Sequence, residues 1–412
     1  FDLVVGNPPW VRAEHLAPVV REQLAERYHW WRTEAGPAAK GYRHQPDLSV
    51  AFLERAHELA APGGIVGLIV PAKIATAGYG AAARRGLARD LTLHLLSDLT
   101  TNDAQFDATV YPMMIVSGKA RPPRDHVVRL VADSAQGPCI RQDRLEPGAP
   151  WILRNVDVAP LASELSARFP PLGQSHRMHL GVKTGANDVF LDFPEDIEPH
   201  LIRPAIRGRD VSPFTVTKTI PLLWPCNDQG EPLECLPQNA LNHFQKHRNV
   251  LLARTDYKRG PAWTLFRTGP AMAPCRVVWP DLALRLTAVA LTGPKHAHLI
   301  PLNTCYVMPV TSAAEANATA AFLNSTWARA LARLGADVAS GGFARFNVRA
   351  IARLPFPPTV PLDRRLADFA RDDSHPSDQE TLDELAAAHF DLSAAERRIL
   401  ASVAGVGARY RG

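Results

Sequence analysis

The 412-residue sequence predicts an α/β fold in its first part, followed by an irregular α+β region and a short helical tail. In residues 1–121, short apolar runs alternate with helical periodicity, which is typical of parallel β-α-β units. In residues 176–360, short β-like runs are separated by many prolines and glycines. The length is sufficient for two or three domains, each with its own core.

The first region contains four runs that predict strands, at residues 3–5, 65–70, 93–99 and 111–116. A helix is predicted between the first two, because Leu48, Phe52, Ala56 and Leu59 recur at helical spacing. Pro62-Gly63-Gly64 then ends this helix before the second strand.

The remaining chain divides into three segments by composition. Residues 122–175 are proline-rich, and we expect a connecting segment with little regular structure. Residues 176–360 contain β-like runs at 277–279 and 306–309 and a predicted helix at 314–334. In the charged, helical tail 361–412, Ser393 and Glu396 form a capping box that begins the last helix.

The composition excludes several classes of protein. The sequence is 46% hydrophobic and 21% charged, and it has no apolar stretch of the ~20 residues that a membrane helix needs. The five cysteines form no C-x-x-C pair, so we expect neither zinc nor a disulfide framework, but buried thiols in the cytoplasm. A net charge of +5 suits a polyanionic partner without identifying one.

The motif Asn7-Pro8-Pro9-Trp10 directly follows the first predicted strand, with Gly6 expected to allow a sharp exit. The carboxyl ends of strands in an open parallel sheet are where ligands bind. The side-chain oxygen of Asn7 and the carbonyl of Pro8 are two acceptors that can hold the two N–H bonds of an amino group. Such a grip draws out the nitrogen lone pair, as amino-group methylation requires.

Trp10 adds a flat face on which a base swung out of a duplex can stack. The alternative interpretation is a proline-rich turn with a buried Trp. The position directly after a strand favours the functional interpretation.

This motif resembles motif IV of the amino-methyltransferases that modify adenine in DNA, whose pattern is (Asp/Asn/Ser)-Pro-Pro-aromatic. The order of the further matches resembles the gamma class, and within it the single-chain type II restriction-modification methylases. The resemblance implies the C-terminal part of a Rossmann-like class I methyltransferase sheet at 1–121 and a target-recognition domain at 176–360. It also implies S-adenosylmethionine as methyl donor and double-stranded DNA as substrate.

Two further segments resemble motifs of that family. Asp47 and Phe52 lie in a motif V likeness and inherit contacts to the cofactor, although Phe52 can equally be a core residue of an amphipathic helix. Phe106 opens a motif VIII likeness and would cover the face of the base opposite Trp10, with a core role as the alternative.

Motif I, the main cofactor loop of the family, has no match. Gly78-Tyr-Gly80 begins eight residues after the end of a strand, so we reject it as a cofactor loop. The sequence starts at Phe1 without Met or a signal peptide, so we expect an N-terminally truncated chain. Such a fragment should bind the cofactor poorly and be nearly inactive, with the missing part or a separate restriction or defence subunit as partner.

The predicted recognition domain offers several cations. The segment 181–190 resembles the entry to the family's recognition domain, and the expected DNA contacts are Lys183, Thr184, Arg207, Arg209 and Arg345. The alternative for each cation is a solvated surface side chain.

Other functions remain open at this stage. Protein glutamine and RNA methyltransferases also use Asn-Pro-Pro-aromatic clamps, although they usually end soon after motif VIII. A DNA-recognition module without catalysis is a second alternative. A nuclease is not expected, because no metal-binding carboxylate cluster is evident.

Overall fold

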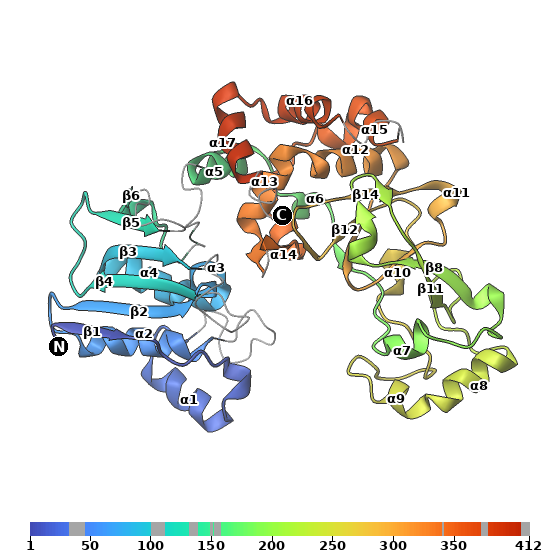
Figure 1. Cartoon of the computed structure of the whole chain (residues 1–412), viewed down its shortest axis with the longest axis horizontal. Helices are drawn as coiled ribbons and strands as arrows, with labels where there is room; N and C mark the ends of the chain where they lie inside the picture. The colour runs from blue at the N-terminus through green and yellow to red at the C-terminus, as the bar shows by residue number, and fades with distance from the viewer. Residues whose placement is uncertain are drawn as a thin grey trace. The chain divides into compact units, whose positions relative to one another are not determined.

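The computed structural model describes residues 1–32, 46–99, 112–131, 139–148, 151, 158–339, 342–371 and 378–404. The chain forms two compact units, Phe1–Ala159 and Pro160–Gly412 (Figure 1). Each unit contains its own cluster of buried hydrophobic side chains.

The first unit is a six-stranded sheet with helices packed on it (Figure 1). Helix α2 packs against β2, and α4 packs against β3. The elements of this unit are β1 (Leu3–Gly6), α1 (Pro18–Arg27), α2 (Leu48–Leu59), β2 (Ile65–Pro71), α3 (Lys73–Thr76), α4 (Ala81–Asp90), β3 (Thr92–Asp98), β4 (Pro112–Gly118), β5 (Val127–Val131) and β6 (Cys139–Arg141).

The strand order is β1-β2-β4-β3-β5-β6. The α/β class is confirmed, and β1 and β2 are parallel as expected. The sheet is mixed, because β4 is antiparallel to both β2 and β3, so the parallel β-α-β pattern does not extend to the run at 111–116. Burial on both faces gives a strand the same apolar pattern in either direction, so the sequence did not reveal its orientation.

The prediction of little regular structure in 122–175 is also wrong. Strand β5 pairs with β3 and β6 pairs with β5, so both extend the first sheet. Helix α5 (Val158–Arg168) follows. The alternating burial of β5 is visible in its sequence, Val-Val-Arg-Leu-Val, but the neighbouring prolines obscured it.

The predicted helix at 48–60 is confirmed as α2, but its buried face differs from the prediction. Leu53 is fully buried, whereas Phe52 and Leu59 are 44% and 39% exposed. The apolar positions of this helix extend around more than one face, so spacing alone did not identify the face that meets the sheet.

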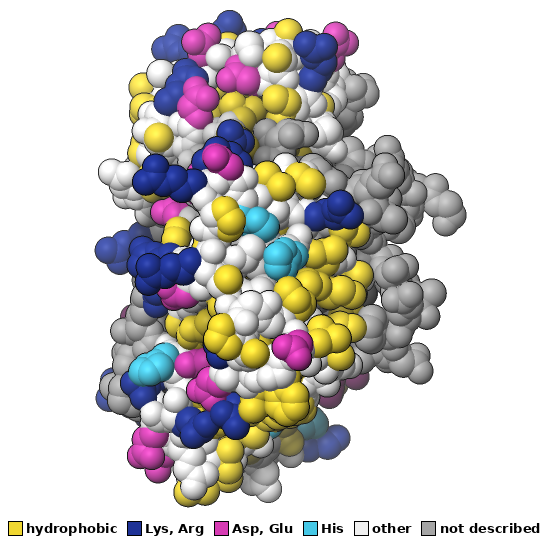
Figure 2. Space-filling model, turned by 90° about the vertical axis from the view of Figure 1, so that its left-hand side faces the viewer, with side chains coloured by type: hydrophobic (Ala, Val, Ile, Leu, Met, Phe, Trp, Pro, Cys, Tyr) yellow, Lys and Arg dark blue, Asp and Glu magenta, His cyan; other side chains and the backbone are white. Residues whose placement is uncertain are grey.

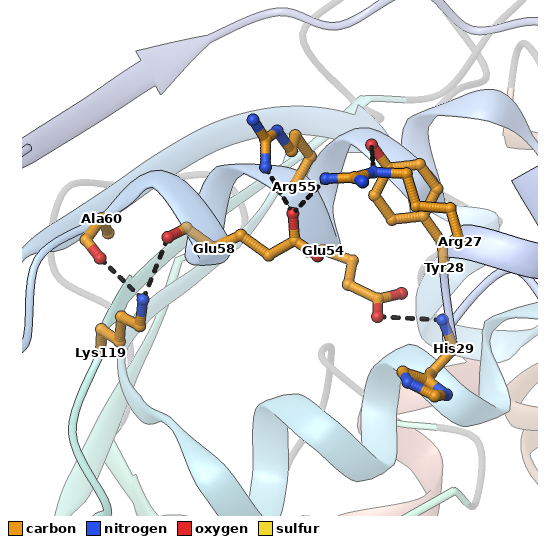
Figure 3. A network of polar contacts seen from close by, with 8 residues as sticks. All are labelled: Arg27, Tyr28, His29, Glu54, Arg55, Glu58, Ala60 and Lys119. Carbon is orange, nitrogen blue, oxygen red and sulfur yellow. Dashed lines mark hydrogen bonds and ion pairs between the residues drawn. The ribbon is translucent and has the colours of Figure 1, made fainter.

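A network of polar contacts joins α2 to the segment after α1 (Figure 3). The carboxylate of Glu54 accepts hydrogen bonds from the backbone N–H groups of His29 and Trp30, at 3.0 and 2.6 Å. Beside this network, Trp31 is buried with Ala13 and Ala51. Figure 3 also shows contacts of Glu58 with Arg27 and Arg55, and of Lys119 with the carbonyls of Glu58 and Ala60. In addition, Arg27 donates to the Tyr28 hydroxyl at 3.2 Å.

His57 joins α2 to β4 inside the first unit. Its Nδ1 lies 2.8 Å from the Leu53 carbonyl oxygen and its Nε2 lies 2.8 Å from Ser117 Oγ. Burial lowers the pKa of His57 from its ordinary 6.5, while the Leu53 carbonyl opposes this shift. The imidazole therefore stays neutral in the folded protein at a pH where the unfolded chain binds a proton.

This difference predicts that the free energy of unfolding decreases as pH falls below about 6.5, because the unfolded state then takes up more protons. Urea unfolding of the wild type and of His57→Gln at pH 7.5 and 5.5 measures the effect. The decrease should be smaller in the variant, although His94 and His247 also have lowered pKa values and retain part of it. Equal decreases in both proteins would contradict the assignment to His57.

The second unit contains several small sheets (Figure 1). The largest has the order β14-β12-β16-β7 and is antiparallel at each pairing. The expected runs at 277–279 and 306–309 are confirmed as β12 and β16. The strands are β7 (His179–Leu180), β8 (Ile202–Ile206), β9 (Val211–Ser212), β10 (Thr215–Val216), β11 (Ile220–Leu223), β12 (Arg276–Pro280), β13 (Leu282–Ala283), β14 (Val289–Leu291), β15 (Ile300–Pro301), β16 (Cys305–Pro309), β17 (Asp337–Val338) and β18 (Ala344–Arg345).

The helix predicted at 314–334 is two helices. Ser325 has extended backbone angles, and its hydroxyl accepts a hydrogen bond from the Ala328 N–H at 3.2 Å, which caps the second helix. The helices of this unit are α6 (Leu172–Ser175), α7 (Asn187–Phe190), α8 (Gln238–Lys246), α9 (Arg248–Leu252), α10 (Thr268–Ala271), α11 (Gly293–His296), α12 (Ala313–Asn324), α13 (Thr326–Gly335), α14 (Val348–Ala352), α15 (Arg364–Arg371), α16 (Gln379–Phe390) and α17 (Ala394–Ala404).

The helical tail packs on the second unit: α15 lies against α12, and α17 lies against α13. The predicted capping box is confirmed, since Glu396 accepts from the Ser393 N–H at 2.7 Å and Ser393 Oγ accepts from the Glu396 N–H at 3.3 Å. No helix in the described ranges has the length and apolar character to cross a membrane.

All five cysteines are free thiols. The expectation that they are buried is right for Cys226 and Cys305 and wrong for the exposed Cys139 and Cys235. Burial raises the pKa of Cys226 to about 12, so this thiol is not activated.

Candidate functional site

The tetrapeptide Asn7 to Trp10 lies at the carboxyl ends of two parallel strands. It directly follows β1, and the indole N–H of Trp10 donates to the carbonyl of Ile69 at 3.3 Å, near the end of β2. This is the edge of a parallel pair at which ligands bind in open α/β sheets.

The side chains of this motif differ in their accessibility. Asn7 and Pro9 are exposed, Trp10 is half-buried and Pro8 is buried. Neither the Asn7 side chain nor the Pro8 carbonyl takes part in a hydrogen bond with the residues that the structure describes. The arrangement therefore leaves two acceptors without a partner among the described residues, of which the Asn7 side chain is exposed, beside a half-buried indole. It does not support a proline-rich turn that buries its Trp.

The segment after the motif is tied to the start of α2. The Val11 carbonyl accepts from the Leu48 N–H at 2.8 Å, and the Ala13 N–H donates to Pro46 at 2.9 Å. These two bonds fix the chain that leaves Trp10.

Asp47 differs from the expectation of a cofactor contact. It is 7% exposed, and its Oδ1 accepts hydrogen bonds from both the N–H and the hydroxyl of Ser49, at 3.0 and 2.6 Å. The carboxylate is used as the N-cap of α2. We therefore correct its assignment to a structural one, which the sequence allowed because an acid before a helix fits both roles.

Phe52 is 44% exposed, so the alternative of a core residue is not supported. It is one of several large hydrophobic side chains at the surface of this unit, with Leu3 and Val5 of the edge strand β1. Figure 2 shows patches of hydrophobic side chains on one face of the molecule. Phe106 lies outside the described residues, and its role stays a prediction.

Two glycine interpretations can be compared with the structure. Gly80 ends a short turn after α3, and a Cβ there would lie 2.2 Å from the Ile74 carbonyl oxygen. This glycine serves close packing, consistent with its rejection as part of a cofactor loop. Gly6 has no left-handed backbone, and a Cβ there would meet only Leu68 at 3.7 Å. The expected need for glycine at position 6 is therefore wrong.

The cations expected to contact DNA have different surroundings in the second unit. Lys183 forms an ion pair with Asp256, each about one-third exposed. Arg209 is exposed and has no ion pair or hydrogen bond with any residue in the described ranges.

Two other expected contacts are held by acids. Arg207 donates to both oxygens of Asp210, at 2.8 and 3.2 Å, and Asp210 also accepts from the Arg207 N–H. Arg345 pairs with Asp281 and keeps half of its side chain exposed. Arg207 and Arg345 are therefore paired with acids and are not the freely solvated surface cations of the alternative interpretation.

Thr184 does not face solvent. It is 2% exposed, and its hydroxyl donates to Asn187 at 2.6 Å. A contact between this side chain and DNA is therefore not supported, and we correct its role to support of the 183–187 turn.

Sequence reasoning missed Arg254, which organises the same turn. Its buried guanidinium donates to the carbonyls of Thr184, Leu251 and Ala262 and lies over the ring of Phe266 at 4.8 Å. Burial lowers its pKa. Nothing in the local sequence distinguishes this arginine from a surface cation, since its acceptors lie as far as 70 residues away.

Comparison with known proteins finds a family that the motif-bearing part of the chain is similar to. Residues 1–106, which contain the whole tetrapeptide, match the family of Eco57I restriction-modification methylases. The match covers about the first quarter of the chain and is a similarity to that family. The sequence-based resemblance to restriction-modification methylases is thereby confirmed.

The similarity to individual proteins extends over most of the chain. The type II methyltransferase M.XhoI of Xanthomonas vasicola is 25% identical over 436 aligned residues, which cover 98% of this chain and 77% of the relative. M.PaeR7I of Pseudomonas aeruginosa, also a type II methyltransferase, is 26% identical over 403 residues, covering 90% of this chain and 67% of the relative.

Among solved structures, the fold is similar to that of the type IIL restriction-modification enzyme MmeI in complex with DNA. The TM-score is 0.61 at 14% identity, and the match covers 99% of this chain. The chain spans 57% of that protein. This likeness confirms the fold class for both units.

Proposed function

We propose that this chain carries the catalytic motif and the recognition region of an enzyme that transfers the methyl group of S-adenosylmethionine to N6 of adenine in double-stranded DNA. We place this enzyme in a restriction-modification system. The observation that carries the proposal is the exposed Asn7 side chain at the carboxyl ends of β1 and β2, which bonds to none of the described residues. The curated relatives are type II methyltransferases, which supports the reaction class.

The chemistry follows from the two available acceptors. The Asn7 side-chain oxygen and the Pro8 carbonyl would each accept a hydrogen bond from one N–H of the adenine amino group. This localises the nitrogen lone pair for attack on the methyl group. Trp10 would stack on the flipped base, and Phe106 is the proposed residue for its other face. The Trp10–Ile69 hydrogen bond sets the orientation of the indole.

S-adenosylmethionine would supply the methyl group as an electrophile. Of the two residues first assigned to it, the exposed aromatic Phe52 fits a contact with the adenine part, whereas the buried cap Asp47 does not. We therefore retain only Phe52.

We assign DNA recognition to the second unit, with Arg209 as a phosphate contact because it is exposed and lacks an ion pair among the described residues. Three further cations remain proposed DNA contacts, each paired with an acid: Lys183 with Asp256, Arg207 with Asp210 and Arg345 with Asp281. A recognition module without catalysis is the second candidate, and a protein or RNA amino-methyltransferase is the third.

Transfer of tritiated methyl groups tests these candidates. The whole open reading frame that contains this chain is expressed and incubated with labelled S-adenosylmethionine and duplex DNA, single-stranded RNA or protein. Label in duplex DNA alone is expected. Salt-sensitive DNA binding without transfer would favour the recognition module, and label in RNA or protein would contradict the DNA assignment.

A further inference from the structure

Asp281 is held rigidly at the end of β12 in the second unit. Its N–H donates to the Thr304 carbonyl at 2.9 Å, and its carbonyl accepts from the Phe346 N–H at 2.7 Å. The preceding Trp279 is fully buried, and its indole N–H donates to the Phe346 carbonyl at 2.9 Å. The backbone of Asp281 is thus fixed on both sides, next to the start of β16 and the end of β18.

The backbone of Arg345 is also held in a sheet, and its guanidinium points to Asp281. It lies on β18 between β13 and β17, opposite Leu282 on one side and Asp337 on the other. Its Nη1 pairs with Asp281 Oδ2, while its Nε and Nη2 donate to none of the residues that the structure describes. Half of the Arg345 side chain is exposed. The Nη1 corner of the planar guanidinium is therefore fixed by Asp281, whereas the edge formed by Nε and Nη2 has no partner among the described residues.

The Asp281 carboxylate depends on this arginine. Its Oδ1 is buried and accepts no hydrogen bond within the described ranges. Burial and the charge of Asp337 raise the pKa of Asp281, whereas the charge of Arg345 lowers it. The attraction between the two charges therefore holds the Arg345 guanidinium at the Asp281 carboxylate.

The surroundings favour a base edge over a phosphate as the ligand of the open edge. Asp281 and Asp337 both lie near Arg345, and two carboxylates repel a phosphate that approaches the same guanidinium. A base edge carries no net charge. Guanine offers O6 and N7, the acceptor pair that an arginine fork binds in the major groove.

Arg267 differs from Arg345 because no acid pairs with it among the described residues. It is exposed and has no ion pair among the described residues, and its backbone is left-handed with φ of 64°. Burial and the charge of Asp281 raise the pKa of Tyr306, whereas the charges of Arg345 and Arg267 lower it. Phe266, next to Arg267, pairs through its backbone with Lys183, at 3.0 and 3.1 Å.

We propose that Arg345 reads a guanine of the target sequence through the open edge of its fork, and that Asp281 is the positioning residue that aims it. This inference rests on the proposed function, since it requires the second unit to bind DNA. Arg267, by contrast, acts on the phosphate backbone and carries no sequence information.

The experiment is selection of bound duplexes from a randomised pool, followed by sequencing, with the full protein and its variants. Arg345→Lys keeps the charge but loses the fork, so it should relax the preference at one G·C pair at least about tenfold while the other positions stay unchanged. Asp281→Asn should relax the same pair. Arg267→Ala is the matched control, and it should weaken binding to all duplexes equally, with a smaller salt dependence.

The outcomes separate the two proposals. A wild-type consensus that Arg345→Lys leaves intact, or weakens uniformly as Arg267→Ala does, would overturn the inference and leave the proposed function standing. The absence of any consensus for the wild type would contradict the proposed function and the inference together. Thermal unfolding of each variant verifies that the second unit stays folded.

Discussion

Asn7→Ala is expected to lower the rate of methyl transfer to DNA by about 10²- to 10³-fold, while DNA affinity changes little. The magnitude is that of removing one preorganised polar partner from the reacting group in a site of this kind. Asn7 is exposed and its side chain bonds to none of the described residues, so the substitution should not affect folding. Single-turnover kinetics with saturating DNA measure the rate.

Asn7→Asp is the matched control. It retains a side-chain oxygen acceptor at the same position, and the sequence pattern of amino-methyltransferases admits Asp there. We expect its rate to lie well above that of Asn7→Ala. An Asn7→Ala enzyme within tenfold of the wild-type rate would contradict the proposed role of the motif.

Arg276→Met is expected to reduce the free energy of unfolding by about 2–6 kcal/mol. Arg276 is completely buried in β12. Its guanidinium donates to the carbonyls of Ala273, His296 and Leu299, the last two at 2.9 and 2.7 Å. Burial lowers its pKa to about 10 without a carboxylate as an opposing cause. Removing the donors leaves the carbonyls of Ala273 and Leu299 without this partner, each worth about 1–3 kcal/mol, whereas the His296 carbonyl keeps the Leu299 N–H at 3.2 Å.

Urea unfolding of the wild type, Arg276→Met and Arg276→Lys measures the loss. The lysine variant keeps the charge but not the planar set of donors, so its stability should lie between the other two. A methionine variant within about 1 kcal/mol of the wild type would show that these hydrogen bonds contribute little.

The position of the Asn7–Trp10 motif at a strand end could be predicted from the sequence because its signal is local. A strand, four residues of fixed chemistry and the start of a new segment are contiguous, and the structure places them at the carboxyl ends of β1 and β2. The helix α2 and the capping box at Ser393 are local patterns too, and both are present.

What the sequence could not supply is information about pairing. The direction of β4 depends on which strands it joins, and the roles of Asp47 and Thr184 depend on whether their side chains face solvent. The acid that holds Arg345 lies 64 residues away in the chain. Such long-range partners decide whether a cation is free to bind a phosphate or is held for another purpose.

The most direct test of the central claim is mass spectrometry of nucleosides from duplex DNA incubated with the full protein and S-adenosylmethionine that carries a trideuterated methyl group. We predict the label in N6-methyladenine alone, because the two acceptors of the motif grip an exocyclic amino group. Label on cytosine, or label on protein or RNA in parallel samples and none on adenine, would contradict the proposed reaction.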